Sequence, residues 1–239
     1  NNGLTKISPL KTLSSVSKIK LQPSDRILLA SNQLYLDGIK LINQTGTKDN
    51  PIIITTVNWN VAESKIIPAI IDFKGSPNGV LIQDCNFIEV SNLNLTADGF
   101  FNENNHNMHC GVLVKNTNPN SMEHIIIKNL RIDNVYYENY GYKRGDAEVR
   151  TANGTQKYGW GIRVINKQES LINNVKILNC SISNVSHTGI KLTGNSKNIT
   201  EVTISNNIVE KTGGPGIQMS LVKNVFIKNN FISHSGSND

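Results

Sequence analysis

The chain has 239 residues, a formal net charge of +6 and a pI of about 9.2, and only 18% of its residues are charged. No run of about 18 apolar residues is present, which excludes a membrane-spanning helix within this sequence. The basic balance favours an acidic partner, and the absence of a dense Lys/Arg block argues against nucleic acid. The three cysteines are widely spaced and odd in number, which argues against a disulfide scaffold or a zinc site and favours buried thiols.

The first fifty residues predict a short helix followed by short strands. Leu10, Leu13 and Val16 have helical spacing, with Ser8 as the N-cap and Pro9 in the first turn. Short apolar stretches at 25–29, 33–36, 38–42 and 52–55 are typical of strands. We expect the helix to cover the open edge of the first strands.

Two patterns recur through the rest of the chain. A Gly-apolar-x-apolar pattern stands at 79–82, 111–114, 161–164, 189–192 and 216–219. An apolar-x-Asn-x-x-apolar pattern follows each of these, with its amide at Asn92, Asn129, Asn179, Asn206 and Asn229. Together they predict three short strands per repeat, stacked in parallel as the rungs of a solenoid. We expect each of these amides at a bend, where stacked copies can bond one another in a ladder.

The segments at 21–29 and 46–54 resemble the opening of bacterial right-handed parallel β-helix proteins, and the Asn-bearing rungs are similar to the same superfamily. The resemblance implies an all-β fold: a right-handed parallel β-helix with a short N-terminal capping helix. We expect one domain over 1–239, forming the N-terminal part of a longer solenoid, because the last rung-like segment has no cap after it. Superfamily members include alginate lyase and chondroitinase B type polysaccharide lyases and glycoside hydrolases. The resemblance therefore implies a secreted, periplasmic or cell-surface bacterial protein with a polysaccharide substrate.

The rung spacing locates one large insertion. The glycines at 161, 189 and 216 are one repeat apart, whereas almost two repeats separate Gly111 from Gly161. The surplus lies between Val135 and Trp160 and holds five of the six tyrosines. Aromatic faces stack on sugars and charged groups bind hydroxyls or carboxylates, so we predict a substrate-binding loop, with a simple packing flap as the alternative. Its candidates are Tyr136, Tyr137, Tyr140, Tyr142, Lys143, Arg144, Arg150, Tyr158 and Trp160.

The strand after each glycine supplies a second group of candidates. Its apolar residues should face inward, so the residue between them should face outward. On three consecutive rungs that residue is Arg163, Lys191 and Gln218. Two cations about 4.8 Å apart repel each other, which predicts an anionic ligand or acids from the insertion between them. Solvated surface cations are the alternative.

Three functions remain open from the sequence. The resemblance implies a polysaccharide lyase in which Lys191 and Arg163 perform β-elimination, with His187 close to the strand of Lys191. A glycoside hydrolase would need paired carboxylates, for which Asp146 and Glu148 are candidates. A glycan-binding solenoid would need neither. Calcium is a candidate cofactor for neutralising a uronate, and His106 and His109 form only a weak metal pair.

Overall fold

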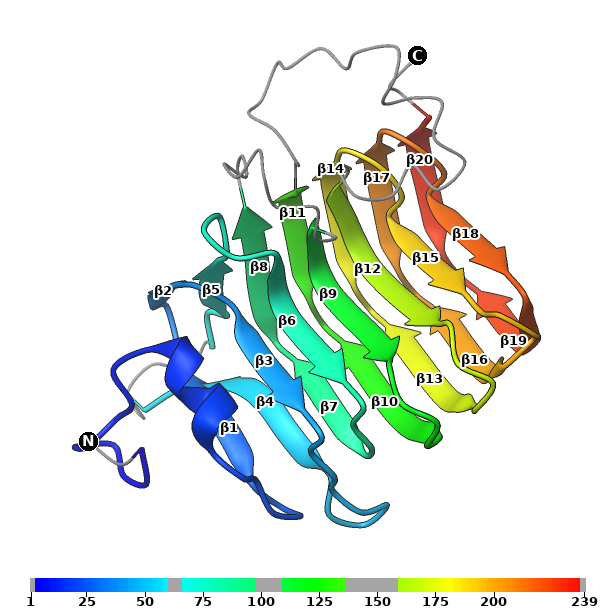
Figure 1. Cartoon of the computed structure of the whole chain (residues 1–239). Helices are drawn as coiled ribbons and strands as arrows, with labels where there is room; N and C mark the ends of the chain where they lie inside the picture. Colours follow the sequence, from blue (N-terminus) through cyan, green and yellow to red (C-terminus); the bar gives the residue numbers. More distant parts are fainter. Residues whose placement is uncertain (1–2, 60–65, 98–108, 136–158, 237–239) are drawn as a thin grey trace.

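The computed structural model describes residues 3–59, 66–97, 109–135 and 159–236. Parallel strands dominate these residues and form three sheets, which we call sheets A, B and C (Figure 1). Each turn of the chain adds one strand to each sheet, and each strand pairs in parallel with the strand one turn earlier. The predicted arrangement of three strands per rung is therefore confirmed.

Sheet A contains seven strands, which are β1 (Arg26–Ala30), β4 (Ile52–Val57), β7 (Ile88–Ser91), β10 (Met122–Lys128), β13 (Ile172–Leu178), β16 (Ile199–Ser205) and β19 (Val222–Lys228). Sheet B contains seven, which are β2 (Leu34–Leu36), β5 (Ala69–Asp72), β8 (Leu93–Ala97), β11 (Arg131–Val135), β14 (Ser181–Val185), β17 (Ile208–Thr212) and β20 (Phe231–Ser235). Sheet C contains six, which are β3 (Ile39–Ile42), β6 (Asn78–Gln83), β9 (His109–Asn116), β12 (Gly159–Asn166), β15 (Ile190–Thr193) and β18 (Ile217–Ser220).

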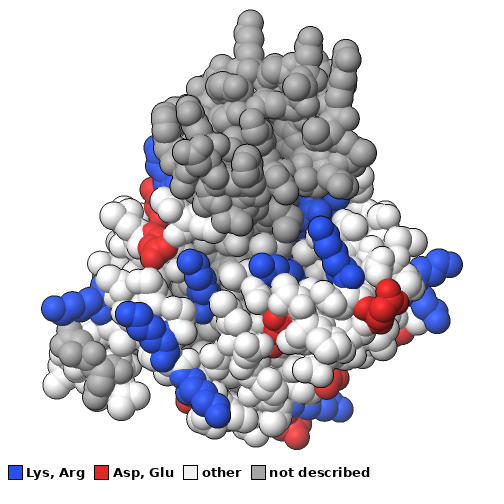
Figure 2. All heavy atoms as spheres, in the orientation of Figure 1, with Lys and Arg blue, Asp and Glu red and all other residues white. Residues whose placement is uncertain are grey.

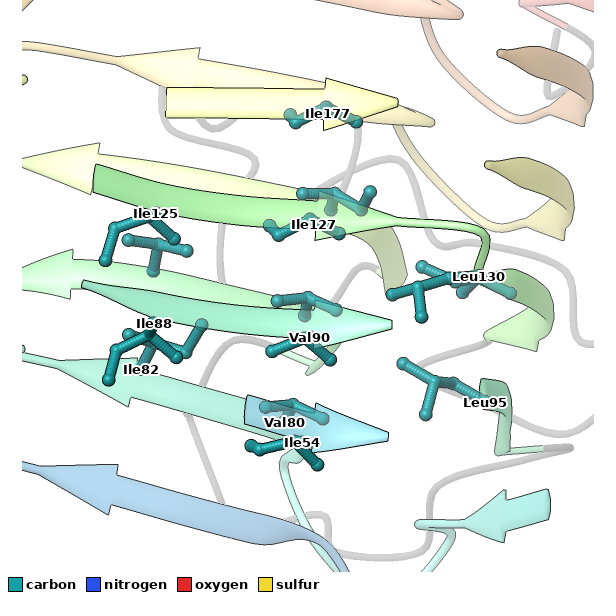
Figure 3. Close-up of a cluster of buried hydrophobic side chains, with 14 of the residues drawn as sticks. Ile54, Val80, Ile82, Ile88, Val90, Leu95, Ile125, Ile127, Leu130 and Ile177 are labelled. Atoms are coloured by element: carbon teal, nitrogen blue, oxygen red, sulfur yellow. The ribbon is translucent and has the colours of Figure 1, made fainter. Parts of the chain in front are cut away.

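The core consists of aliphatic side chains stacked from rung to rung. In sheet A the register aligns Ile54 with Val90, Val90 with Ile127 and Ile127 with Ile177, and all four are fully buried (Figure 3). Side chains alternate between the two faces of a strand, so every second residue reaches this interior. Burying one such side chain contributes about 1.5–3 kcal/mol to the free energy of folding, and each further rung adds another buried side chain to the column.

The recurring glycines of sheet C mark close contacts between rungs. A Cβ on Gly111 would lie 2.7 Å from the carbonyl oxygen of Gly161, and one on Gly189 would lie 2.7 Å from that of Gly216. Such distances are shorter than van der Waals contact, so a side chain would push the rungs apart. Close backbone approach explains why this position repeats as glycine.

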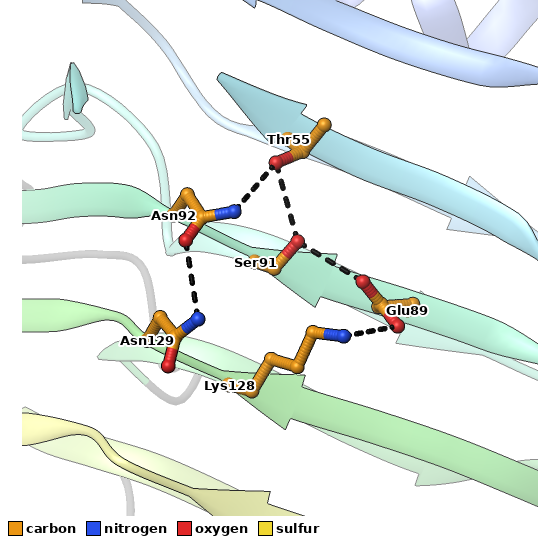
Figure 4. Close-up of polar contacts among 6 residues, drawn as sticks. All are labelled: Thr55, Glu89, Ser91, Asn92, Lys128 and Asn129. Atoms are coloured by element: carbon orange, nitrogen blue, oxygen red, sulfur yellow. Dashed lines mark hydrogen bonds and ion pairs between the residues drawn. The ribbon is translucent and has the colours of Figure 1, made fainter. Parts of the chain in front are cut away.

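The five predicted bend asparagines all adopt left-handed backbone conformations, with φ between 53° and 57°. Asn tolerates this conformation better than most residues, which explains the repeat. Asn129 donates a side-chain hydrogen bond of 3.2 Å to Asn92, which is one step of the expected ladder (Figure 4). A ladder along the whole column stays a prediction.

The N-terminal helix differs from the expectation. It is a 3-10 helix, η1 (Leu13–Lys18), and it begins after Thr12 rather than after Ser8. The side chain of Thr12 makes no capping hydrogen bond to the helix. Leu13 and Val16 are nevertheless buried against the core, so η1 covers the first rung as predicted. Packing of these two apolar residues, rather than capping, fixes the helix.

The last described rung is more exposed than those before it. Ile232 is 44% exposed, whereas Val209 and Ile182, which precede it in the same column, are fully buried. That further rungs follow stays a prediction.

The three cysteines are free and buried, as predicted. Burial raises the pKa of the Cys85 thiol to about 11 and that of Cys180 to about 12, so both stay protonated at neutral pH.

Candidate functional site

The outer face of sheet C brings together basic and apolar side chains. Its strand register aligns one outward-facing column, which runs through Lys40, Leu81, Leu113, Arg163, Lys191 and Gln218. None of the six strands contains Asp or Glu, although Lys115 adds a further cation. Basic side chains are spread over the side of the molecule on which these strands lie (Figures 1 and 2). The outer face of these six acid-free strands is the candidate site.

The predicted adjacency of Arg163, Lys191 and Gln218 is confirmed. Arg163 is aligned with Lys191, and Lys191 is aligned with Gln218, on three neighbouring strands. Burial decreases along this series, because Arg163 is buried, Lys191 is half-buried and Gln218 is exposed. Arg163 is therefore the most buried cation of this column, while Gln218 lies on the last described strand of sheet C.

Arg163 departs from the expectation of an exposed cation, since it projects outward from sheet C but is only 3% exposed. Its guanidinium lies over the ring of Trp160, with 4.7 Å between Cζ and the ring centroid. Bulky apolar residues on the same outer face, among them Leu113 and Ile165, are also buried. Sequence alternation predicts the direction of a side chain but not the bulk of its neighbours on other rungs.

The polar atoms of Arg163 are incompletely satisfied. Its Nε and Nη1 atoms are buried and have no hydrogen-bond partner. Burial lowers the pKa of Arg163, while the neighbouring Cys110 acts in the opposite direction. A buried cation without a partner is unfavourable, because it has lost hydration without gaining an opposite charge. The site is therefore suited to an incoming anion.

Lys191 is the second cation of the pair. Burial lowers its pKa, and the positive charge of Arg163 lowers it further. Both effects favour the neutral amine, which is the form that can accept a proton. The Oγ1 atom of Thr193, on the same face of the strand, is also buried without a hydrogen-bond partner.

His187 lies in the turn that precedes Lys191 and packs tightly. Its ring is tilted against Trp160 at a centroid distance of 5.4 Å, and its Nδ1 lies 2.7 Å from Oγ1 of the buried Thr188. A Cβ on Gly214 would lie 3.3 Å from Nδ1 of His187, so glycine leaves room for the imidazole. The ring is thus held in one place against Trp160, whose ring also contacts Arg163.

Trp160 also differs from the expectation of an exposed aromatic that stacks on sugar. It is fully buried, and its ring is in contact with Arg163 and His187. Its position therefore suits holding those two side chains better than stacking on a sugar ring.

A family model described as "Right handed beta helix region" matches residues 160–239. Together with the three parallel sheets, this match decides the fold. The chain is a right-handed parallel β-helix.

The solved structures that share this fold include the following two. The lacto-N-biosidase of family GH136 from Eubacterium ramulus superposes with a TM-score of 0.73 at 23% identity, over 92% of this chain and 41% of that one. A rhamnogalacturonan lyase superposes with a TM-score of 0.56 at 14% identity, over 97% of this chain and 60% of that one. This chain thus spans less than two thirds of either relative. A search of the curated proteins finds no match to this chain.

Several candidates lie outside the described residues of the β-helix. They are Tyr136, Tyr137, Tyr140, Tyr142, Lys143, Arg144, Asp146, Glu148, Arg150 and Tyr158, together with His106. Within the described ranges, no group of three His, Cys, Asp or Glu side chains is arranged to hold a metal ion. The same residues include no helix long and apolar enough to cross a membrane.

Proposed function

We propose that this β-helix belongs to a secreted or cell-surface bacterial enzyme that cleaves an acidic polysaccharide by β-elimination on the outer face of sheet C. The observation that carries the proposal is the pair of adjacent cations, Arg163 and Lys191, on strands without any acidic residue. Support for a carbohydrate substrate comes from the two β-helix structures above, which are named as a lacto-N-biosidase and a rhamnogalacturonan lyase.

The cation pair provides the two functions that β-elimination needs. Arg163 neutralises the carboxylate of a uronate, which makes the adjacent C5–H bond more acidic. The neutral amine of Lys191 takes that proton. The electron pair of the C–H bond then forms the C4–C5 double bond, and the glycosidic oxygen leaves C4 with the bonding pair and later gains a proton. His187, which packs against the Trp160 ring that contacts Arg163, is the candidate donor of that proton.

A panel of acidic glycans tests the proposal. Alginate, pectate, chondroitin and ulvan are each incubated with the protein, with and without calcium. Ultraviolet absorbance follows the unsaturated product, and a parallel assay counts new reducing ends. Absorbance that rises with the reducing ends supports β-elimination, and a requirement for calcium would make that ion a cofactor.

Two other results would replace the proposal. Reducing ends without ultraviolet absorbance would indicate a glycoside hydrolase, and attention would move to Asp146 and Glu148. Glycan binding without new ends would indicate a binding solenoid, in which the cations of sheet C serve recognition alone.

A further inference from the structure

The buried position of Arg163 bears on which chemical form of an acidic glycan the site accepts. The Nε and Nη1 atoms of Arg163 are buried without partners, and the residue is more than nine-tenths buried. The apolar residues buried on the same outer face are Leu81, Cys110, Leu113, Trp160 and Ile165. Electrostatic interactions are stronger beside such apolar side chains than in water, and they are less screened by salt.

We propose that Arg163 forms a desolvated carboxylate subsite, so that the enzyme accepts free uronates and rejects their methyl esters. This inference rests on the proposed function, because it concerns the acidic unit that the lyase would cleave. It adds a chemical restriction that β-elimination does not itself impose. A methyl ester carries no negative charge and already activates the adjacent C–H bond, so its rejection would be a property of this site.

The neighbours of Arg163 on sheet C indicate which other groups can contact a bound carboxylate. Gln218 is exposed, Lys191 is half-buried and Arg163 is buried, on three neighbouring strands. A carboxylate bound at Arg163 would lie one strand away from Lys191. Thr193 adds a buried hydroxyl without a partner on the same face, which can donate to a second oxygen of the ligand. No acidic side chain on the six strands of sheet C competes for the two cations.

The discrimination should be large. An ester in place of the carboxylate would leave the buried guanidinium unpaired and would exclude water from it as well. Removing one partner of a buried charge pair weakens an interaction by about 100-fold or more. A solvated surface cation would instead discriminate only a few-fold and would lose that preference at high salt.

Affinity electrophoresis measures this preference without requiring cleavage. Polygalacturonate and alginate serve as probes, each as the free acid and as a highly esterified form. The natural protein is compared with Arg163→Met, which keeps apolar bulk, and with Lys176→Met as a matched control. Lys176 is a half-buried lysine on the outer face of sheet A. Circular dichroism verifies that each variant is folded.

We expect the natural protein and Lys176→Met to bind at least one free acid about 100-fold more tightly than its ester. In Arg163→Met the ratio should fall to within a few-fold of one. Equal binding of acid and ester by the natural protein, or an unchanged ratio in Arg163→Met, would overturn the subsite.

The results separate this inference from the proposed function. Cleavage of acid and ester alike would support the proposed lyase activity and contradict the carboxylate subsite. Strong preference for binding the acid, without cleavage, would support the carboxylate subsite and contradict the proposed lyase activity. Failure to bind any free acid would remove the subsite and the acidic substrate together.

Discussion

Sheets A and C both carry cations on their outer faces, but the two sheets differ in whether an acidic side chain lies beside those cations. On sheet A, Nζ of Lys128 lies 2.8 Å from Oε2 of Glu89 on the neighbouring strand. Glu89 also accepts a hydrogen bond from Ser91. The hydroxyl of Ser91 is in turn hydrogen-bonded to that of Thr55 on β4 (Figure 4). Each charged group in this network thus has a partner within the sheet.

On sheet C the corresponding partner is absent among the described strands. Arg163 and Lys191 are neighbours in register, and the six strands contain no acid, whereas the strands of sheet A contain Glu89, Glu123 and Glu201. Repelling cations cost stability unless something compensates them. The difference teaches that the Lys128–Glu89 pair is compensated within sheet A, while the adjacent cations of sheet C are suited to a ligand.

The largest expected effect is on catalysis by sheet C. Lys191→Ala removes the proposed base and should lower kcat by about 10²–10⁴-fold while the fold persists. The ultraviolet assay on the cleaved glycan measures this loss. Lys176→Ala, on sheet A, should retain full activity. Unchanged turnover in Lys191→Ala would mean that another group accepts the proton.

A second large effect concerns acid stability and compares two histidines. His109, at the start of β9 in sheet C, is fully buried, and its burial lowers its pKa to about 3 from the usual 6.5. The unfolded chain therefore binds a proton below about pH 6.5, whereas the folded chain does not until about pH 3. The stability that neutral His109 contributes is complete above pH 6.5 and is lost as the pH falls from 6.5 to 3.

Urea unfolding across that pH range tests the effect. In this window the free energy of unfolding should fall by about 1.4 kcal/mol per pH unit on account of His109. His109→Gln should flatten the slope, even if its stability at neutral pH is lower. His124→Gln, in sheet A, is the control and should keep the slope. An identical slope in both variants would assign the acid sensitivity to other groups.

A third effect reverses the usual direction of a core substitution. Arg163→Met removes a buried cation that lacks hydrogen-bond partners and keeps much of the apolar bulk. Loss of the contact with Trp160 offsets part of the gain, so we expect the free energy of unfolding to rise by about 1–2 kcal/mol. The melting temperature should then rise by about 2–4 °C per kcal/mol. A clear fall in melting temperature would show that Arg163 stabilises the fold.

The repeating backbone explains why the fold could be predicted from the sequence. Gly161 and Gly189 recur because the neighbouring rung approaches too closely for a side chain. Asn92 and Asn129 recur because both adopt a left-handed conformation. Each constraint returns once per rung, so it leaves a periodic signal. The same register made the adjacency of Arg163 and Lys191 predictable.

Features set by contacts between different rungs left no such signal. The burial of Arg163 depends on bulky neighbours such as Trp160 and Leu113, which belong to its own and the preceding rung. The buried hydroxyl of Thr193 and the buried ring of His109 are also products of packing. The start of η1 was mispredicted because a single short 3-10 turn is fixed by tertiary packing of Leu13 and Val16, not by local capping.

The smallest effect belongs to sheet A. Glu89→Gln removes the charge that faces Lys128 but keeps a hydrogen-bonding side chain of the same size. Lys128 is about one third exposed. Because such a partly solvated ion pair contributes about 0–1 kcal/mol, we expect a loss of that size in the free energy of unfolding, measured by urea at neutral pH.

A double-mutant cycle with Lys128→Met isolates the pair, and added salt should shrink the coupling energy. A coupling of several kcal/mol would contradict the expectation that this partly solvated ion pair contributes about 0–1 kcal/mol. It would also weaken the contrast with sheet C, because it would show that charged groups on the outer face of this β-helix can contribute strongly to stability without any ligand. The alternative result is a small coupling energy between Glu89 and Lys128 together with a higher free energy of unfolding in Arg163→Met. Because Arg163 would then not stabilise the fold, ligand binding would be the better explanation for its presence.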